Sequence, residues 1–225
     1  MEENEIVDNS LIVDKTFFVV LLGDDNVGKT NILFNYLNEE INYGNSSIIG
    51  IEANEKVIEK NNEKILLKLI DSAGQERSKG VTKIIYQKGD AFIIFFNYSI
   101  YESFNSIIYW INNIIEYSYY IYIWPPILIV GIKNDDDDNI ETGNMNLDSI
   151  KQKMKENKLN FNDKNVNKIK FINCNYKKLN EINNIFKTIL DDILENKSER
   201  ENIEERAPSF CLQNIKENKK PKCCK

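Results

Sequence analysis

The sequence predicts an α/β fold in which a mostly parallel six-stranded sheet has helices on both faces. Apolar runs of strand length alternate with helix-like patterns along most of the chain. A glycine-rich loop joins the first apolar run to the first helical pattern. Strands that alternate with helices form parallel sheets that are covered on both faces, which is why such strands are apolar throughout.

Each predicted strand is an apolar run bounded by polar or turn residues. "TFFVVLLG" begins this series, and the run "IEANEKVIEKNNEKILLKLID" predicts two strands around a turn at Asn61-Asn62. The six strands are expected at 16–23, at two places within 51–71, and at 91–96, 126–132 and 168–174.

Helices are predicted from apolar residues that recur at helical spacing. One helix opens at "GKTNILFNYLNEE", and another is expected at 147–159. Two further helices carry apolar stripes made of Phe104, Ile107, Ile108, Ile111, Ile114 and Ile115, and of Ile182, Ile185, Phe186, Ile189, Leu190 and Ile193.

The 225 residues suffice for one well-buried domain. We expect an N-terminal extension at 1–14, a domain at 15–195 and a flexible tail at 196–225. The tail is predicted because periodicity fades, charge rises and Pro208 interrupts the pattern.

Composition excludes several classes of protein. The net charge of −6 argues against nucleic acid as the main partner. No apolar run reaches the roughly 18–20 residues of a spanning helix, and the acidic start lacks the apolar core of a signal peptide. The four cysteines have neither metal-site nor disulfide-framework spacing, and the chain has no His, so a reducing intracellular compartment is expected.

The loop "GDDNVGKT" at 23–30 fits the P-loop pattern G-x-x-x-x-G-K-[ST] and lies between a predicted strand and a helix. Gly23 and Gly28 allow the backbone to curl so that its N–H groups surround phosphate oxygens. Lys29 is placed to reach the β- and γ-phosphates, and the Thr30 hydroxyl to bind Mg²⁺. The fold class is therefore predicted to be a P-loop NTPase, with a chance glycine-rich turn as the alternative.

A second motif, "DSAGQER", follows the end of a predicted strand. Asp71 is placed to hold Mg²⁺ through a water, and the backbone N–H of Gly74 to contact a γ-phosphate. Gln75 is placed to orient an attacking water. Taken without the P-loop, Asp71 and Gly74 are better explained as a turn that ends a strand.

A third motif, "VGIKND", lies at the end of another predicted strand. A carboxylate at Asp135 matches the N1–H and N2–H₂ edge of guanine, which adenine lacks. The stem of Lys133 is placed to cover the face of the base. The alternative is a solvated acidic loop, since Asp135 opens the run "DDDD".

Together these motifs resemble the small GTPases of the Ras superfamily, and most closely the Rab branch. "GDDNVGKT", "IGIE", "DSAGQER", "IKND" and "YESFNSIIYW" occur in that family's order, and the resemblance covers about residues 15–195. It implies GTP hydrolysis to GDP and phosphate, at a slow intrinsic rate, with GTP/GDP and Mg²⁺ as cofactors.

The resemblance also implies a set of site residues. Gln75 and Lys29 would be catalytic, and Thr30, Asp71 and Ser47 would bind the metal. The nucleotide would be bound by Gly23, Asp25, Asn26, Val27, Gly28, Lys29, Thr30, Asp71, Gly74, Lys133, Asp135, Tyr176 and Lys177.

The sequence ends "KENKKPKCCK", in which Cys223 and Cys224 lie among lysines. Rab proteins commonly carry two C-terminal cysteines that receive geranylgeranyl groups, and two lipids anchor a protein far better than one. The last ten residues hold five Lys and one Glu, a net charge of +4 that favours an anionic leaflet. The alternative is a tail with incidental thiols.

The implied function is a GDP/GTP switch in intracellular vesicle trafficking, on the cytoplasmic face of intracellular membranes and cycling with the cytosol. Its expected partners are a guanine nucleotide exchange factor, a GTPase-activating protein, a Rab escort protein, a GDP-dissociation inhibitor and effectors, with no nucleic acid.

Three departures from the family pattern keep a second interpretation open. Ile48 occupies the position of the metal-binding Thr, and Ser47 can replace that Thr only if the loop shifts by one residue. Asp25 puts a carboxylate near the γ-phosphate, and Ile132 replaces the Asn of the family's Asn-Lys-x-Asp motif. These residues favour a prenylated guanine-nucleotide-binding scaffold without hydrolysis. A P-loop kinase is a third, weaker interpretation, disfavoured by Gln75.

Overall fold

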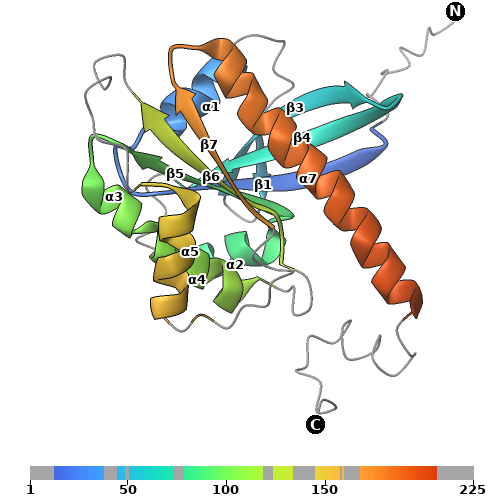
Figure 1. Cartoon of the computed structure of the whole chain (residues 1–225). Coiled ribbons are helices and arrows are strands. Elements are labelled where there is room, and N and C mark those ends of the chain that lie inside the picture. The colour runs from blue at the N-terminus through green and yellow to red at the C-terminus, as the bar shows by residue number, and fades with distance from the viewer. Residues whose placement is uncertain are drawn as a thin grey trace, which may run out of the picture.

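The computed structural model describes residues 13–37, 45–48, 51–72, 79–118, 124–133, 145–157, 159 and 168–206. The strands are β1 (Lys15–Leu22), β2 (Asn45–Ile48), β3 (Ile51–Lys60), β4 (Glu63–Asp71), β5 (Ala91–Asn97), β6 (Ile127–Lys133) and β7 (Ile169–Asn175). The helices are α1 (Lys29–Leu37), α2 (Lys79–Lys88), α3 (Tyr101–Asn105), α4 (Ile107–Tyr117), α5 (Leu147–Glu156) and α7 (Leu179–Arg206). Figure 1 shows their arrangement.

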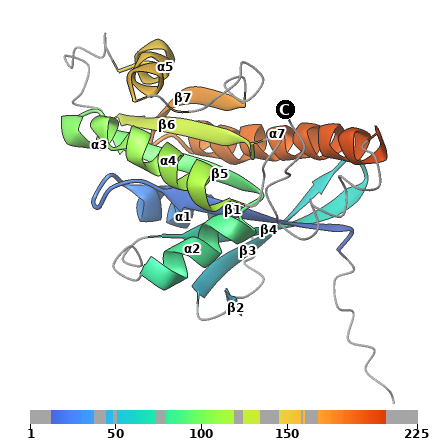
Figure 2. The same ribbon diagram turned by 90° about the horizontal axis from the view of Figure 1, so that it is seen from below.

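The strands form one sheet in the order β2-β3-β4-β1-β5-β6-β7. In Figure 2 this order runs from β2 at the bottom to β7 near the top. The pairs β2–β3 and β3–β4 are antiparallel, and all other neighbours are parallel. The mostly parallel α/β fold is therefore confirmed. Within the described residues the sheet has seven strands rather than the predicted six. The additional strand is β2, whose sequence "NSSI" has no apolar pattern and which pairs with β3.

Successive residues of a strand point to opposite faces of the sheet and build two separate cores. In β6, Leu128 and Val130 belong to one core, and Ile127 and Ile129 to the other. The first core packs against α1 and α7, and the second against α2, α3, α4 and α5 (Figure 1). Helices thus cover both faces, as the apolar strands predict.

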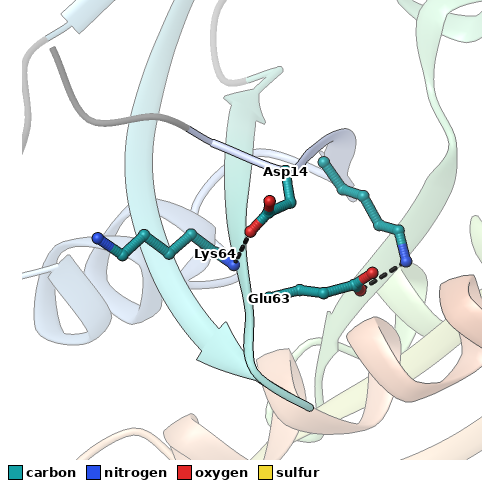
Figure 3. A network of polar contacts seen from close by, with 4 residues as sticks. Asp14, Glu63 and Lys64 are labelled. Atoms are coloured by element: carbon teal, nitrogen blue, oxygen red, sulfur yellow. Dashed lines mark hydrogen bonds and ion pairs between the residues drawn. The ribbon is translucent and has the colours of Figure 1, made fainter.

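The hairpin between β3 and β4 turns at Asn61 and Asn62, where the turn was predicted. Their φ angles of 54° and 62° are those of a type I′ turn, which suits the twist of paired strands. The start of β1 is tied to this hairpin by two hydrogen bonds. The Asp14 N–H donates to the Lys64 backbone oxygen over 2.8 Å, and the Lys64 backbone N–H donates to Asp14 Oδ2 over 2.6 Å (Figure 3). Asp14 is thus joined to the hairpin, one residue before the predicted start of the domain at Lys15.

The last helix is longer than the sequence pattern indicates. Residues 196–206 were predicted to be tail, but α7 continues to Arg206. One side chain beyond the apolar stripe is still packed: Asn196 is buried, and its amide donates to the backbone oxygen of Trp124 over 3.1 Å. Across the described helices, α7 included, no stretch combines the length and apolarity that crossing a membrane requires.

Two further helix predictions differ in detail. The helix expected at 147–159 ends at Glu156, where the amide N–H of Asn157 bonds back to the Lys153 oxygen. Its start is as expected, with Asn146 accepting a bond from the Ser149 N–H as N-cap. The apolar stripe that begins at Phe104 is divided between two helices, α3 and α4, at Ser106.

Candidate functional site

The predicted site lies where the carboxyl ends of the parallel strands meet. From β1, the chain leads to β4 on one side of that strand and then to β5 on its other side. Ligands of open α/β sheets bind at such a reversal, just beyond the carboxyl ends of the strands. Gly23 follows β1, Asp71 ends β4, and Lys133 ends β6. The topology therefore places three separate motifs along one edge of the sheet.

The loop from Gly23 to Gly28 curls tightly because three of its residues have positive φ angles. These are 137° at Gly23, 61° at Asn26 and 106° at Gly28. A Cβ atom at Gly23 would lie 2.3 Å from the carbonyl oxygen of Phe95, so only glycine fits there. Asn is among the few other residues that tolerate such a conformation. The backbone thus has the curl that the P-loop pattern predicts.

Lys29 lies inside this loop rather than in solvent. The residue is only 4% exposed, and its ammonium group donates to the backbone oxygens of Gly23 at 2.5 Å and Asp24 at 2.8 Å. A buried ammonium group needs such acceptors, since burial without them is costly. The lysine is therefore held beside the curled backbone, where a phosphate oxygen would meet both its charge and the loop N–H groups.

Thr30 and Asp71 come together although 41 residues separate them. The Thr30 hydroxyl donates to Asp71 Oδ2 over 2.6 Å. Mg²⁺ prefers oxygen ligands and usually takes only one or two from the protein, with phosphates and water completing the shell. No group of three or more His, Cys, Asp or Glu side chains suited to a metal occurs in the described parts of the chain. The pair therefore offers oxygen atoms of the kind that Mg²⁺ binds.

Ile132 packs directly under the loop. It is 2% exposed and belongs to the same core cluster as Val27. Its Cδ1 atom lies 3.2 Å from where a Cβ on Gly28 would be. At this position the family that the chain resembles has an Asn whose amide bonds to the loop, whereas this chain has an apolar contact. The residue therefore supports the loop by packing.

Lys133 lies over the ring of Tyr98, with its Nζ atom 5.1 Å from the ring centroid. This distance is within the range of a cation–π interaction. The Tyr98 hydroxyl donates to Asn173 Oδ1 in β7 over 2.7 Å, which fixes the ring between two strands. Tyr98 also lies against Gly131, where an added Cβ would meet its Cε2 atom at 2.6 Å. Tyr98 thus positions the end of β6.

The predicted residues after β7 form a tight turn. The Lys177 N–H donates to Asn175 Oδ1 over 2.9 Å, and the Asn175 N–H donates to Glu181 Oε2 over 2.8 Å. Asn35 of α1 donates to the backbone oxygen of Tyr176 over 3.2 Å. The turn is therefore joined to α1, the helix that follows the loop from Gly23 to Gly28. This contact places Tyr176 and Lys177 at the same edge of the sheet as that loop.

The remaining predicted residues are placed only in part. Asp25 and Asn26 are exposed in the loop, and Val27 is buried beneath it. Ser47 lies in β2, but its side chain is outside the described part, as are Gly74, Gln75, Asp135, Cys223 and Cys224. Their roles stay predictions.

No pattern in the sequence predicts two side chains that contact residues of this edge. The Trp110 indole N–H donates to Asp24 Oδ1 over 3.1 Å across 86 residues, and Tyr98 lies under Lys133. The P-loop pattern accepts any residue at position 24, so it gives no signal there. Tyr98 directly follows the apolar strand β5 and belongs to no motif, so only the fold brings it to the site.

Two buried groups near this edge predict that alkaline pH destabilises the fold. Burial raises the pKa of Tyr98 to about 12, and burial, with a smaller effect of Glu181, raises the pKa of Cys174 to about 12. Both groups stay neutral in the folded chain, while the unfolded chain loses these protons from about pH 9–10 upward. The unfolded state then binds fewer protons, so the free energy of unfolding falls as pH rises toward 12, by up to about 1.4 kcal/mol per pH unit and group.

Urea denaturation at pH 8 and pH 10.5 measures this loss. We expect wild type to lose about 3 kcal/mol between the two pH values from these groups. Tyr98→Phe and Cys174→Ala should each flatten the dependence on pH, whatever their effect at pH 8. An unchanged slope in the double variant would show that other groups cause it.

Comparison with known proteins places this edge in context. The profile of the Ras family matches residues 18–195. Ras-related protein Rab-3A of Homo sapiens is 34% identical over 127 residues, which is 56% of this chain and 56% of that protein. Ras-related protein Rab-3C of Bos taurus is 33% identical over 127 residues, 56% of this chain and 54% of the relative.

Ras-related protein Rab-11B of Dictyostelium discoideum is 34% identical over 117 residues, 52% of each chain. This chain therefore spans about half the length of the curated relatives that it matches.

Proposed function

The chain belongs to the Ras family of small GTPases and is Rab-like, and from this premise we propose that it is a GTP/GDP switch in intracellular vesicle trafficking. The observation that carries the proposal is the joint placement of three side chains. Lys29 is held inside the curled loop, and Thr30 meets Asp71 at 2.6 Å beside it. Members of the family are GTPases that bind GTP or GDP with Mg²⁺.

In this proposal each residue contributes a separate interaction. The ammonium of Lys29 and the loop N–H groups bind the phosphates. Thr30 and, through a water, Asp71 would hold the metal, with Ser47 as a further ligand, and Mg²⁺ would supply charge that neutralises the phosphate oxygens. Asp135 would select guanine, and Gln75 would orient the water that hydrolyses GTP.

Identification of the nucleotide tests the proposal directly. Protein purified without added nucleotide is denatured, and the released small molecules are separated by ion-exchange chromatography. We expect GDP or GTP in about equimolar amount, with retention that depends on Mg²⁺. Equal binding of ATP and GTP in competition would overturn guanine selection through Asp135.

The switch is proposed to act on a membrane through its last residues. A guanine nucleotide exchange factor, a GTPase-activating protein and effectors would read the nucleotide state. A Rab escort protein and a GDP-dissociation inhibitor would deliver and extract a prenylated chain. The support for this part is the Rab likeness, the Cys223-Cys224 pair and the net charge of +4 in the last ten residues.

Changing Cys223 and Cys224 together to Ser is expected to move the protein from membranes to the soluble fraction. One remaining cysteine should give partial and reversible binding, because a single lipid anchors only marginally. Fractionation of cells that express each variant, with mass spectrometry of the C-terminal peptide, measures the effect. An unmodified wild-type peptide from membrane fractions would contradict the anchor.

A scaffold without hydrolysis is the second candidate, and Ile132 is the observation that favours it. Its side chain packs under Gly28 where the resembling family has a hydrogen-bonding amide. Single-turnover hydrolysis separates the two candidates. A measurable rate that Gln75→Leu removes supports the switch, whereas no rate above that of free GTP supports the scaffold.

A further inference from the structure

Trp110 of α4 makes a hydrogen bond to the loop that precedes α1. Its indole N–H donates to Asp24 Oδ1 over 3.1 Å, and the tryptophan is only 6% exposed. Helix α4 cannot shift easily, because Ile107, Ile111 and Ile114 are buried on the face that it packs against the sheet. The indole is therefore a fixed donor that reaches the loop from outside it.

Asp24 connects this donor to the lysine of the loop. While its side chain accepts from Trp110, its backbone oxygen accepts from the Lys29 ammonium over 2.8 Å. Any rotation of the Asp24 peptide that moves its carbonyl away from Lys29 also strains the bond to the indole. The two bonds thus hold one residue from both sides and set where the lysine lies.

The same contact controls the position of a negative charge. The loop contains two adjacent carboxylates, Asp24 and Asp25, and a carboxylate about 4 Å from a phosphate charge is repelled by about 1–4 kcal/mol. The indole N–H holds the Asp24 carboxylate against α4, in the second core's layer of helices. Without that donor the carboxylate is free to turn toward the phosphates.

We propose that Trp110 is a positioning residue for the phosphate-binding loop, which acts through Asp24 on Lys29 and slows nucleotide release. This inference rests on the proposed function of the loop. It gives α4 a role in nucleotide binding that the motif at 23–30 cannot reveal, because Trp110 lies 86 residues from Asp24 in the sequence.

The bond itself is tested by the indole N–H resonances in a ¹⁵N–¹H correlation spectrum. The chain has only two tryptophans, so Trp124→Phe assigns the signal of Trp110. We expect Asp24→Ala to move the Trp110 signal and leave that of Trp124 in place. Asp24→Asn retains an acceptor oxygen at the same position and should keep the signal close to its original shift. An unmoved signal in Asp24→Ala overturns the inference.

The effect on release is measured with fluorescent GDP chased by excess unlabelled GDP. Trp110→Phe and Asp24→Ala should each raise the dissociation rate about tenfold, the effect of losing one hydrogen bond. Their double variant should be no faster than either single variant, and Asp24→Asn should release at nearly the original rate. Tyr109→Phe is the control, because Tyr109 is a neighbouring aromatic on α4 that is 60% exposed.

The outcomes separate this inference from the function on which it rests. If wild type binds no guanine nucleotide, the proposed function fails. If wild type binds and Trp110→Phe releases GDP at the wild-type rate, the function stands and the inference is overturned. Where Trp110→Phe does not fold, Asp24→Ala compared with Asp24→Asn decides, because both leave the core of α4 intact.

Discussion

Gly23→Ala is expected to lower the free energy of unfolding by about 4 kcal/mol and to abolish nucleotide binding. An added Cβ atom would lie 2.3 Å from the carbonyl oxygen of Phe95, and the residue has a φ angle of 137° that side chains rarely adopt. Phe95 is in the middle of β5 and pairs with Val130 of β6, so its backbone cannot move aside without breaking the sheet. Thermal melts and fluorescent GDP titration measure the two losses.

Gly28→Ala serves as a graded comparison. Its φ angle of 106° is also unfavourable, but the nearest obstacle is the end of a flexible side chain, Ile132 Cδ1, at 3.2 Å. We therefore expect a smaller loss of stability than at Gly23. Asn61→Gly, in the distant hairpin turn with φ 54°, should leave nucleotide binding unchanged. A Gly23→Ala protein that melts like wild type would disprove the steric argument.

The layered fold could be predicted because each central strand is apolar on both faces. Leu128, Ile129 and Val130 of β6 alternate between the two cores. A continuous apolar run of this length is typical of a strand that is buried on both faces of a parallel sheet. Two described elements gave no comparable signal. Strand β2 is four residues long and polar, and α2 buries only Ile85 and Tyr86 among its residues with described side chains. Such elements form because of their contacts with neighbouring elements, and their own hydrophobic pattern does not predict them.

The site could be predicted where its residues are consecutive. Gly23, Gly28, Lys29 and Thr30 are encoded in eight adjacent positions, and a loop between a strand and a helix has few ways to place them. Contacts between elements that are distant along the chain could not be predicted from the sequence. Asn35 and Tyr176 are 141 residues apart and meet only because β7 returns to the edge of the sheet beside β6.

The same limit explains the end of α7. An apolar stripe ends near Ile193, so periodicity predicts a tail beyond it. Asn196 is polar, and its burial depends on the backbone oxygen of Trp124, which precedes a strand 72 residues earlier. Charged residues that favour helices then follow to Arg206. A polar anchor of this kind is visible only once both segments have been placed.

Lys29→Met is expected to weaken the binding of GDP and GTP by about a thousandfold. The ammonium is 4% exposed and lies beside the curled backbone, so it would meet phosphate charge with little screening by water. Each hydrogen bond to a charged group contributes about 1.5–3 kcal/mol, and two lost bonds give roughly 10²–10⁴ in affinity. Methionine keeps much of the stem's volume while it removes the charge.

Stability is measured with the affinity, because the same ammonium serves the loop. Removing it leaves the carbonyl oxygens of Gly23 and Asp24 without their donor, which costs about 1–3 kcal/mol where no water replaces it. Calorimetric titration therefore accompanies a thermal melt without added nucleotide. Lys187→Met is the matched control, since that lysine is exposed on α7. Lys29→Met with GDP affinity within threefold of the control would mean that the phosphates are bound by the backbone alone, and the role of Lys29 would be refuted even in a fully folded protein.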